Sequence, residues 1–241
     1  MPDERATGWY CTVRAYGMEF DGSIEYSLLP APRLPEGRAI LAYANLNRLD
    51  LSGARLHRAV LFGAEACFAS FDECDLSDSN LHYAKVWHTS FAGANLRGAD
   101  MRELQGDGFQ RASIAFDGMP PRRWADFRGA DLTGADLTGA KLYEADLRGS
   151  ILDGAKLDAS DLRGCIFADA SMVNTSCRGA QMGRTYEAAD LRGAVLTSAD
   201  FTDAIADPWY KLMEIDATVA RDAQLAIWPD GFDHTRPPDG R

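Results

Sequence analysis

The feature that most restricts the fold of this chain is a period of five residues. The stretch ADLTGADLTGAKLYEADLRGS, residues 130–150, returns a small residue, a polar residue and a leucine in turn. Five residues turn an α-helix by about 500°, so a helix would spread the leucines around its circumference. A flat strand would send successive leucines to opposite faces, because five is odd. Only a chain that turns a corner once per repeat keeps every leucine inside.

The repeat continues over most of the chain when the large apolar residue is taken as its centre. One register runs unbroken from Leu46 to Met101, and a second runs from Phe127 to Met182. A third, shorter register has the centres Leu191, Leu196 and Phe201. Two positions before each centre stands a small residue, usually Ala, with Leu49 the exception. If each repeat is one side of a square, four repeats close a coil of about twenty residues, and coils stack at about 4.8 Å. We therefore predict an all-β solenoid with the centres inside.

The other positions of the repeat are expected to point outward. Asp or Asn often precedes the centre, where a short side chain can accept a backbone N–H bond at a turn. Glycine recurs two residues after the centre and eases the bend. Strings such as ANL at 94–96 and ADL at 130–132 and 145–147 resemble the pentapeptide repeat proteins. This resemblance implies a right-handed quadrilateral β-helix.

The two ends lack the repeat. Residues 1–43 contain Pro30, Pro32 and Pro35 and are expected to cap the solenoid of residues 44–206. Residues 207–241 are predicted to form a C-terminal α-helix and a flexible tail, because WYKLMEIDATVARDAQLAIW has a helical apolar stripe. The stripe includes Trp209, Leu212 and Met213. This helix could cap the last coil or pair with its copy in a homodimer, and both alternatives stay open.

The repeat is interrupted at about 102–124, where we expect an exposed loop. The loop ends on Pro120, Pro121, Arg122, Arg123 and Trp124. Arg and Trp beside a rigid Pro-Pro are residue types that anchor interfaces, which favours a recognition loop. The alternative is an ordinary insertion at a corner.

Composition and motifs limit the possible functions. A net charge of −11 opposes direct contact with nucleic acid or anionic lipid, so a protein partner is expected. No apolar run is long enough to cross a bilayer and no signal peptide is recognisable, which predicts a cytoplasmic protein. The five cysteines form no CxxC, and the four histidines form no HExxH. We therefore expect no catalytic residues, metal or cofactor, and no enzyme.

Shape and charge together suggest a function. About 160 residues at twenty per coil make a rod near 40 Å long, roughly as wide as a nucleic-acid duplex and acidic like one. Pentapeptide proteins of the Qnr and MfpA type, similar in repeat, inserted loop and C-terminal helix, are understood as DNA mimics. The resemblance implies a protein that binds DNA gyrase or topoisomerase IV and protects it from inhibitors, as in antibiotic resistance. The predicted mimicking surface is Asp126, Asp131, Asp136 and Asp146. The alternative is a structural or scaffolding protein-interaction module with no topoisomerase role.

Overall fold

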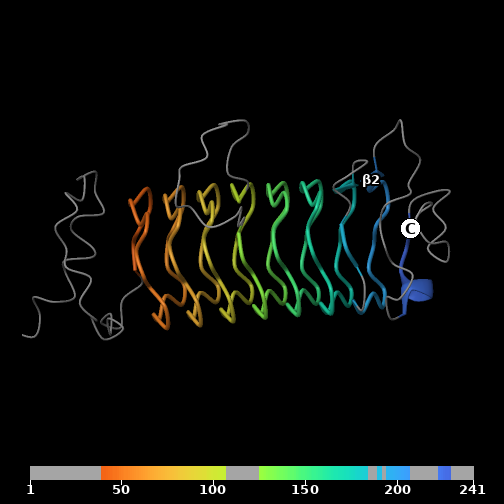
Figure 1. Cartoon of the computed structure of the whole chain (residues 1–241), viewed down its shortest axis with the longest axis horizontal. Coiled ribbons are helices and arrows are strands. Elements are labelled where there is room, and N and C mark those ends of the chain that lie inside the picture. The colour runs from red at the N-terminus through yellow and green to blue at the C-terminus, as the bar shows by residue number, and fades with distance from the viewer. Residues whose placement is uncertain (1–38, 107–124, 184–188, 192–193, 207–221, 229–241) are drawn as a thin grey trace, which may run out of the picture.

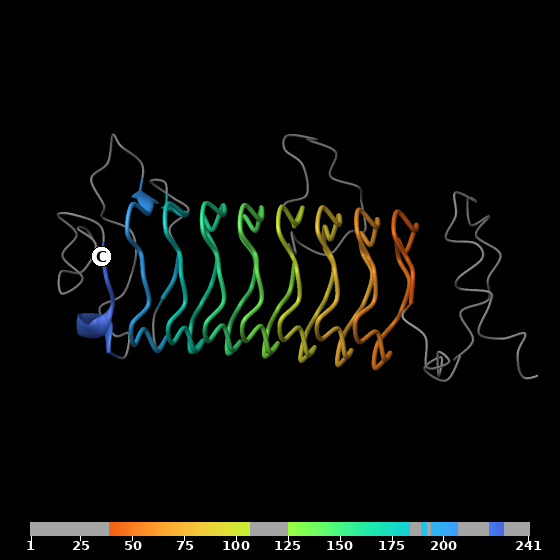
Figure 2. The same ribbon diagram turned by 180° about the vertical axis from the view of Figure 1, so that it is seen from behind.

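The chain folds into an elongated stack of square coils. The computed structural model describes residues 39–106, 125–183, 189–191, 194–206 and 222–228. The coils lie side by side along the long axis, and each has nearly the same outline as its neighbours (Figure 1). The view from behind shows the same regular stacking (Figure 2). None of the described segments forms a helix of the length and apolarity needed to cross a membrane.

Successive coils are joined by parallel backbone hydrogen bonds. The residue before each centre pairs with the residue twenty positions later, as Ile40 does with Val60 and Asp126 with Asp146. Next to the first of these pairs, the N–H of Leu41 donates to the carbonyl of Val60 at 2.7 Å. The predicted coil of twenty residues, one five-residue repeat per side, is therefore confirmed.

Most of these contacts are single bridges, since each side of the square is only a few extended residues long. Two regular strands occur where the pairing is longer. They are β1 (Gln181–Gly183) and β2 (Ile205–Ala206), which pair in parallel. A short 3₁₀ helix, η1 (Ala223–Leu225), follows near the end of the stack.

The bridging residues define four faces, numbered in chain order. The first face carries Ile40, Val60, Asn80, Asp100, Asp136, Lys156, Ser176 and Asp200. The second face carries Asn45, Glu65, Lys85, Gln105, Lys141, Asp161, Gln181 and Ile205. The third face carries Asp50, Ser70, Ser90, Asp126, Asp146, Ile166 and Asp190. The fourth face carries Arg55, Asp75, Asn95, Asp131, Ile151, Ser171 and Val195.

The centres and the small residues before them fill the interior. Behind the third face, the ring of Phe91 stacks on those of Phe71 and Phe127 at centroid distances of 5.2 and 5.0 Å. Where the small residue is Ser, Thr or Cys, its side chain donates to a backbone carbonyl, except at Ser79. Thr175 Oγ1, for example, lies 2.8 Å from the carbonyl oxygen of Leu152 in the preceding coil. A polar atom in this interior is stabilised by such a bond, which explains why these residues replace Ala.

Each corner is a tight turn whose third residue has a positive φ angle. Glycine often occupies this place, as at Gly134 with φ of 66°, and Arg48 adopts φ of 63° in the same position. The preceding Asp or Asn caps the turn from outside. The Oδ1 of Asp136, for example, accepts the backbone N–H of Thr138 at 3.1 Å. The predicted turn-forming role of these side chains is confirmed.

Two insertions leave the stack at the same corner, between the second and third faces, which we call the insertion corner. Ser90 pairs with Asp126, sixteen positions further than the regular spacing, and the chain leaves the stack at Gly106 and rejoins it at Ala125. Ile166 pairs with Asp190, four positions further than the regular spacing. The residues of the predicted loop from 107 to 124 lie outside the described part of the chain.

The repeat is longer at two boundaries than the sequence predicted. It begins at 39 rather than 44, with Ala39 and Leu41 buried. It also continues through 102–106, which the prediction assigned to the loop. There a large residue, Leu104, takes the small position, and Gly106 takes the centre. A Cβ on Gly106 would lie 3.0 Å from the Cδ2 of Leu142, so the exchange of large and small residues preserves the packing.

The predicted C-terminal α-helix is wrong for the residues that can be checked. Residues 222–228 contain only η1, and the backbone of Ile227 then pairs with Asp200 on the first face. The ring of Trp228 stacks on Phe201 at 4.7 Å, and its Nε1 donates to the carbonyl of Ala223 at 2.8 Å. These contacts cover the last centre of the first face. Trp209, Leu212 and Met213 lie outside the described residues.

Candidate protein-interaction surface

The four carboxylates predicted to form one acidic surface lie on three faces. Asp126 and Asp146 are neighbours on the third face, Asp131 lies on the fourth, and Asp136 lies on the first. The first and third faces are opposite sides of the square. The structure therefore brings together only one pair of the predicted set.

That pair is also neutralised by neighbouring arginines. The guanidinium of Arg128 lies 2.6 Å from Asp126, and that of Arg148 lies 2.5 Å from Asp146. The two carboxylate side chains are only 13% and 22% exposed. Each also accepts the backbone N–H of its arginine, so it closes the turn as well. These carboxylates present less negative charge to a partner than their number suggests.

The other two predicted carboxylates are bound within the stack too. Asp131 accepts the hydroxyl of Thr133 at 2.6 Å and pairs with Arg97 of the preceding coil at 3.1 Å. Desolvation acts to raise the pKa of Asp131, but the bonds from Thr133 and Arg97 outweigh it and lower that pKa. Asp136 accepts the hydroxyl of Thr138 at 2.6 Å.

The third face with the corner that follows it is nevertheless strongly acidic. Its described carboxylates are Asp50, Asp72, Glu73, Asp126, Asp146, Asp169 and Asp190. The described arginines on this side are Arg128 and Arg148. The third face is therefore acidic through a different set of residues than predicted, and the opposite first face with its corner also carries Asp100, Glu103, Asp136, Asp158, Asp200 and Asp203.

The first three coils carry an exposed group of aromatic residues, which we call the aromatic surface. It consists of Tyr43, Phe62, Phe68, His82, Tyr83, Trp87 and His88. All stand one or two positions after a centre, at the two corners that flank the second face. Tyr43 is 70% exposed, Tyr83 49% and Phe68 42%. Exposed aromatic groups of this size are typical of protein interfaces.

The aromatic rings contact one another and hold their positions. Phe62 meets Tyr43 and Tyr83 edge-on, with centroids 5.3 and 6.0 Å apart. At the insertion corner, Phe68 stacks on His88 at 4.7 Å. Such contacts limit ring movement, so the surface is ordered before a partner binds.

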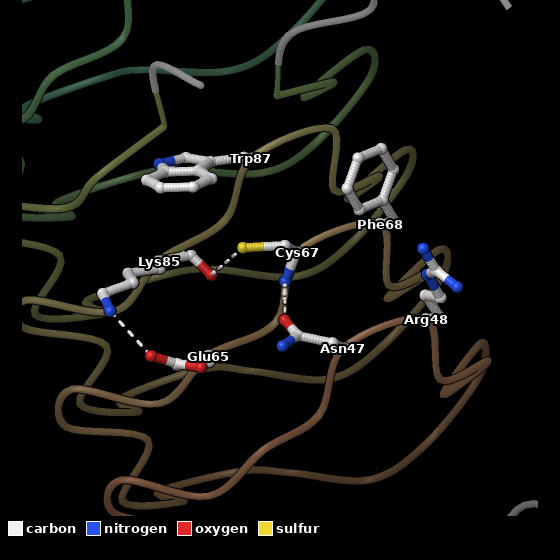
Figure 3. A pocket seen from close by; sticks show the side chains of 7 residues that line it. All are labelled: Asn47, Arg48, Glu65, Cys67, Phe68, Lys85 and Trp87. Carbon is white, nitrogen blue, oxygen red and sulfur yellow. Dashed lines mark hydrogen bonds and ion pairs between the residues drawn. The ribbon is translucent and has the colours of Figure 1, made fainter. Parts of the chain in front are cut away.

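A hollow of about 460 Å³ lies between the second face and the insertion corner. It is lined by Asn47, Arg48, Glu65, Cys67, Phe68, Lys85 and Trp87 (Figure 3). Lys85 and Glu65 form an ion pair at 2.6 Å along one part of the wall, and the indole of Trp87 and the ring of Phe68 supply apolar surface. The hollow can therefore take a group that is partly apolar and partly charged.

The described cysteine thiols are not activated as nucleophiles. Burial raises the pKa of the Cys67, Cys74, Cys165 and Cys177 thiols, that of Cys74 to about 12, so these thiols are protonated near neutral pH. Within the described ranges, no three His, Cys, Asp or Glu side chains are grouped as metal ligands. Cys11 and His234 lie outside those ranges.

Comparison with known proteins identifies the class of fold. A family model described as pentapeptide repeats matches residues 39–78, 74–105, 123–154 and 150–185, in eight copies. The chain therefore belongs to the pentapeptide repeat family, and its solenoid is a right-handed β-helix. Among curated protein sequences, none matches this chain.

Solved structures agree with this assignment. HetL from the cyanobacterium Nostoc sp. strain PCC 7120, a pentapeptide repeat protein involved in heterocyst differentiation regulation, is 30% identical with a TM-score of 0.63. The match covers 81% of this chain and 74% of HetL.

Two further structures share the repeat at lower similarity. The plasmid-mediated fluoroquinolone resistance protein QnrB1, trypsin treated, is 17% identical, with 76% of this chain and 90% of QnrB1 covered and a TM-score of 0.35. A thylakoid-lumen protein of Arabidopsis thaliana is 22% identical, with 68% and 69% covered and a TM-score of 0.15. At such TM-scores neither protein bears on the function of this chain.

The sequence analysis missed the aromatic surface, although the signal was present. The repeat register alone assigns Phe62, Phe68, Tyr83 and Trp87 to outward positions, and extending it by one repeat before Leu46 adds Tyr43. All five precede residue 90. Plotting aromatic residues by their place in the repeat would have found them. The predicted contact residues Pro120, Pro121, Arg122, Arg123 and Trp124 lie outside the described part of the chain.

Proposed function

We propose that this protein is a non-enzymatic interaction module, a rigid rod that binds a protein partner through the aromatic surface. The observation that carries the proposal is the exposure of Tyr43, Phe68 and Tyr83 on coils whose interior is already filled. Their rings stabilise no further part of the described core, and burying them against a partner is favourable at about 25 cal/mol per Å².

The similarity to HetL supports a role in regulation by binding. HetL is involved in regulating heterocyst differentiation, and this chain matches most of its length. A cytoplasmic location, expected from the sequence, is part of this proposal. Dimerisation through Trp209, Leu212 and Met213 remains a prediction.

Co-purification from source cells tests the proposal. A protein retained by the tagged chain should be lost from the double variant Tyr43→Ser, Tyr83→Ser. The matched control is Ile151→Ser, which removes an apolar side chain, 41% exposed, from the fourth face. Retention by all three proteins, or by none, would contradict the proposal.

A second candidate function is the topoisomerase-protecting DNA mimic, and the acidic third face favours it. Its carboxylates follow one side of the rod at the spacing of the coils, and a basic groove that grips DNA could grip that side. A supercoiling assay with purified gyrase decides this candidate. It predicts inhibition at high protein concentration and rescue from a fluoroquinolone, both weakened when Asp50, Asp72 and Glu73 are changed to amides. If neither inhibition nor rescue occurs, the candidate is eliminated.

A further inference from the structure

The indole of Trp87 forms part of the wall of the hollow beside the insertion corner. Its Nε1 is shielded from solvent and makes no hydrogen bond within the described part of the chain. A ligand in the hollow therefore meets the face and edge of the ring rather than the N–H, and the N–H resonance reports any change in this wall.

The same hollow carries an unpaired positive charge. Arg48 is exposed on its rim, and no carboxylate lies within ion-pair distance of it in the described part of the chain. Most other outward arginines have such partners, as Arg102 has in Asp100 at 2.7 Å, whereas Arg55 on the fourth face has none in the described part of the chain. Lys85 on the wall is neutralised by Glu65. The charge that the hollow offers to a ligand is therefore that of Arg48.

The wall between these groups is held in place before anything binds. The backbone N–H of Cys67 donates to the Oδ1 of Asn47 in the preceding coil at 2.7 Å. The Cys67 thiol points to the carbonyl of Lys85 in the following coil, 3.8 Å away (Figure 3). A preformed wall lowers the ordering cost of binding.

We infer that the hollow binds an acidic segment of the protein partner. A carboxylate of the segment pairs with Arg48, and an apolar side chain of the segment packs against the rings of Phe68 and Trp87. This inference rests on the proposed function and names the chemistry of its partner. The unpaired cation selects negative charge, and the open, aromatic-lined hollow suits side chains of a chain segment.

Indole N–H resonances test this assignment on the full-length protein. The chain has five Trp residues, and the Trp87→Phe variant identifies the Trp87 signal. The probe is an acetylated, amidated peptide of alternating Asp and Leu, and the control peptide has Lys in place of Asp. The Trp87 signal should shift saturably with the acidic peptide and not with the basic one.

Two charge reversals provide the matched comparison. Arg48→Glu should weaken the acidic peptide by about tenfold or more, whereas Arg55→Glu on the opposite, fourth face should change affinity by about twofold or less. Both variants are expected to fold, because Glu already occupies the place of Arg48 in other repeats, as at Glu144, and the place of Arg55 at Glu65.

Several outcomes would overturn the inference. The first is that the Trp87 signal does not shift at millimolar acidic peptide, which would also be the result if the chain's own residues occupied the hollow. The second is that the signal responds equally to the basic peptide. The third is that Arg48→Glu and Arg55→Glu change the affinity for the acidic peptide equally. If the partner still co-purifies in dependence on Tyr43 and Tyr83, only the inference about the hollow is lost. If that dependence is absent too, the proposed function falls with it.

Discussion

The coils before the insertion at Gly106 and the coils after it share an interior but differ outside. Leu81 and Leu137 occupy the same inward position of the first face and are equally buried. Outside, the corresponding turns carry Tyr83 in the earlier coil and Thr138 beside Asp136 in the later one. Thr138 and Asp136 bond to each other, whereas Tyr83 remains exposed. The interior therefore maintains the fold in both regions, and the exterior of the earlier coils is available for binding.

The largest expected effect tests whether the two interiors are equivalent. Leu81→Ala and Leu137→Ala should each lower the free energy of unfolding by about 2–5 kcal/mol, because each leaves a cavity in the same column. Urea denaturation followed by circular dichroism measures both. A loss below about 0.5 kcal/mol at either position would show that its column is not close-packed.

A smaller loss is expected at the junction of the two regions. Gly106→Ala should lower the free energy of unfolding by about 1–3 kcal/mol, because the added Cβ would lie 3.0 Å from the carbonyl oxygen of Lys141. Val86, one coil earlier in the same column, fits without exposure. The effect therefore belongs to the junction, and a neutral Gly106→Ala variant would contradict the packing there.

Acid should destabilise the carboxylate-capped turns. The Arg102 hydrogen bond lowers the pKa of Asp100, and at Asp200 the Thr202 bonds outweigh desolvation and also lower the pKa. A lowered folded pKa adds stability above the ordinary value of 3.8, and this stability is lost as pH falls through the folded values. The urea midpoint should therefore stay level from pH 7 to about pH 5 and fall below about pH 4. Thr202→Val should reduce that fall, and a midpoint that rises in acid would refute the assignment.

The smallest effect compares two serines at the same small inward position. Ser150 Oγ donates to the carbonyl of Leu147 at 2.8 Å, whereas the buried Ser79 Oγ has no hydrogen-bond partner among the residues that the structure describes. Ser150→Ala should lower the free energy of unfolding by about 0.5–1.5 kcal/mol. Ser79→Ala should leave it unchanged or raise it by up to about 1 kcal/mol. Equal losses in urea denaturation would mean that the Ser79 hydroxyl is satisfied after all.

Much of the fold could be predicted because the five-residue period directly sets what faces inward. The boundaries could not, since Leu104 and Gly106 exchange large and small places and only their neighbours show that they fit. The end of the stack was also mispredicted. The apolar stripe predicts a helix from local sequence alone. In residues 222–228, however, the ring of Trp228 stacks on Phe201 and the backbone of Ile227 pairs with Asp200, and these tertiary contacts decide the conformation.

The candidate site was harder to predict than the fold. Which face of the earlier coils a carboxylate after Gly106 aligns with depends on how many residues of the insertion lie outside the coil. The sequence alone does not give that number. The separation of Asp126 from Asp131, in contrast, follows from the square coil itself, because successive repeats lie on successive faces. A count of carboxylates also overstated the charge, because Asp126 pairs with Arg128 two residues later, as Asp146 does with Arg148.

Photo-crosslinking in source cells measures most directly whether binding belongs to the earlier coils. A photoreactive phenylalanine analogue replaces Tyr83 in one protein and Ala159 in another, two exposed sites at the same corner in different regions. We predict a defined crosslinked partner from position 83 and none from position 159. Equal crosslinking from both sites, or crosslinking from 159 alone, would contradict the account.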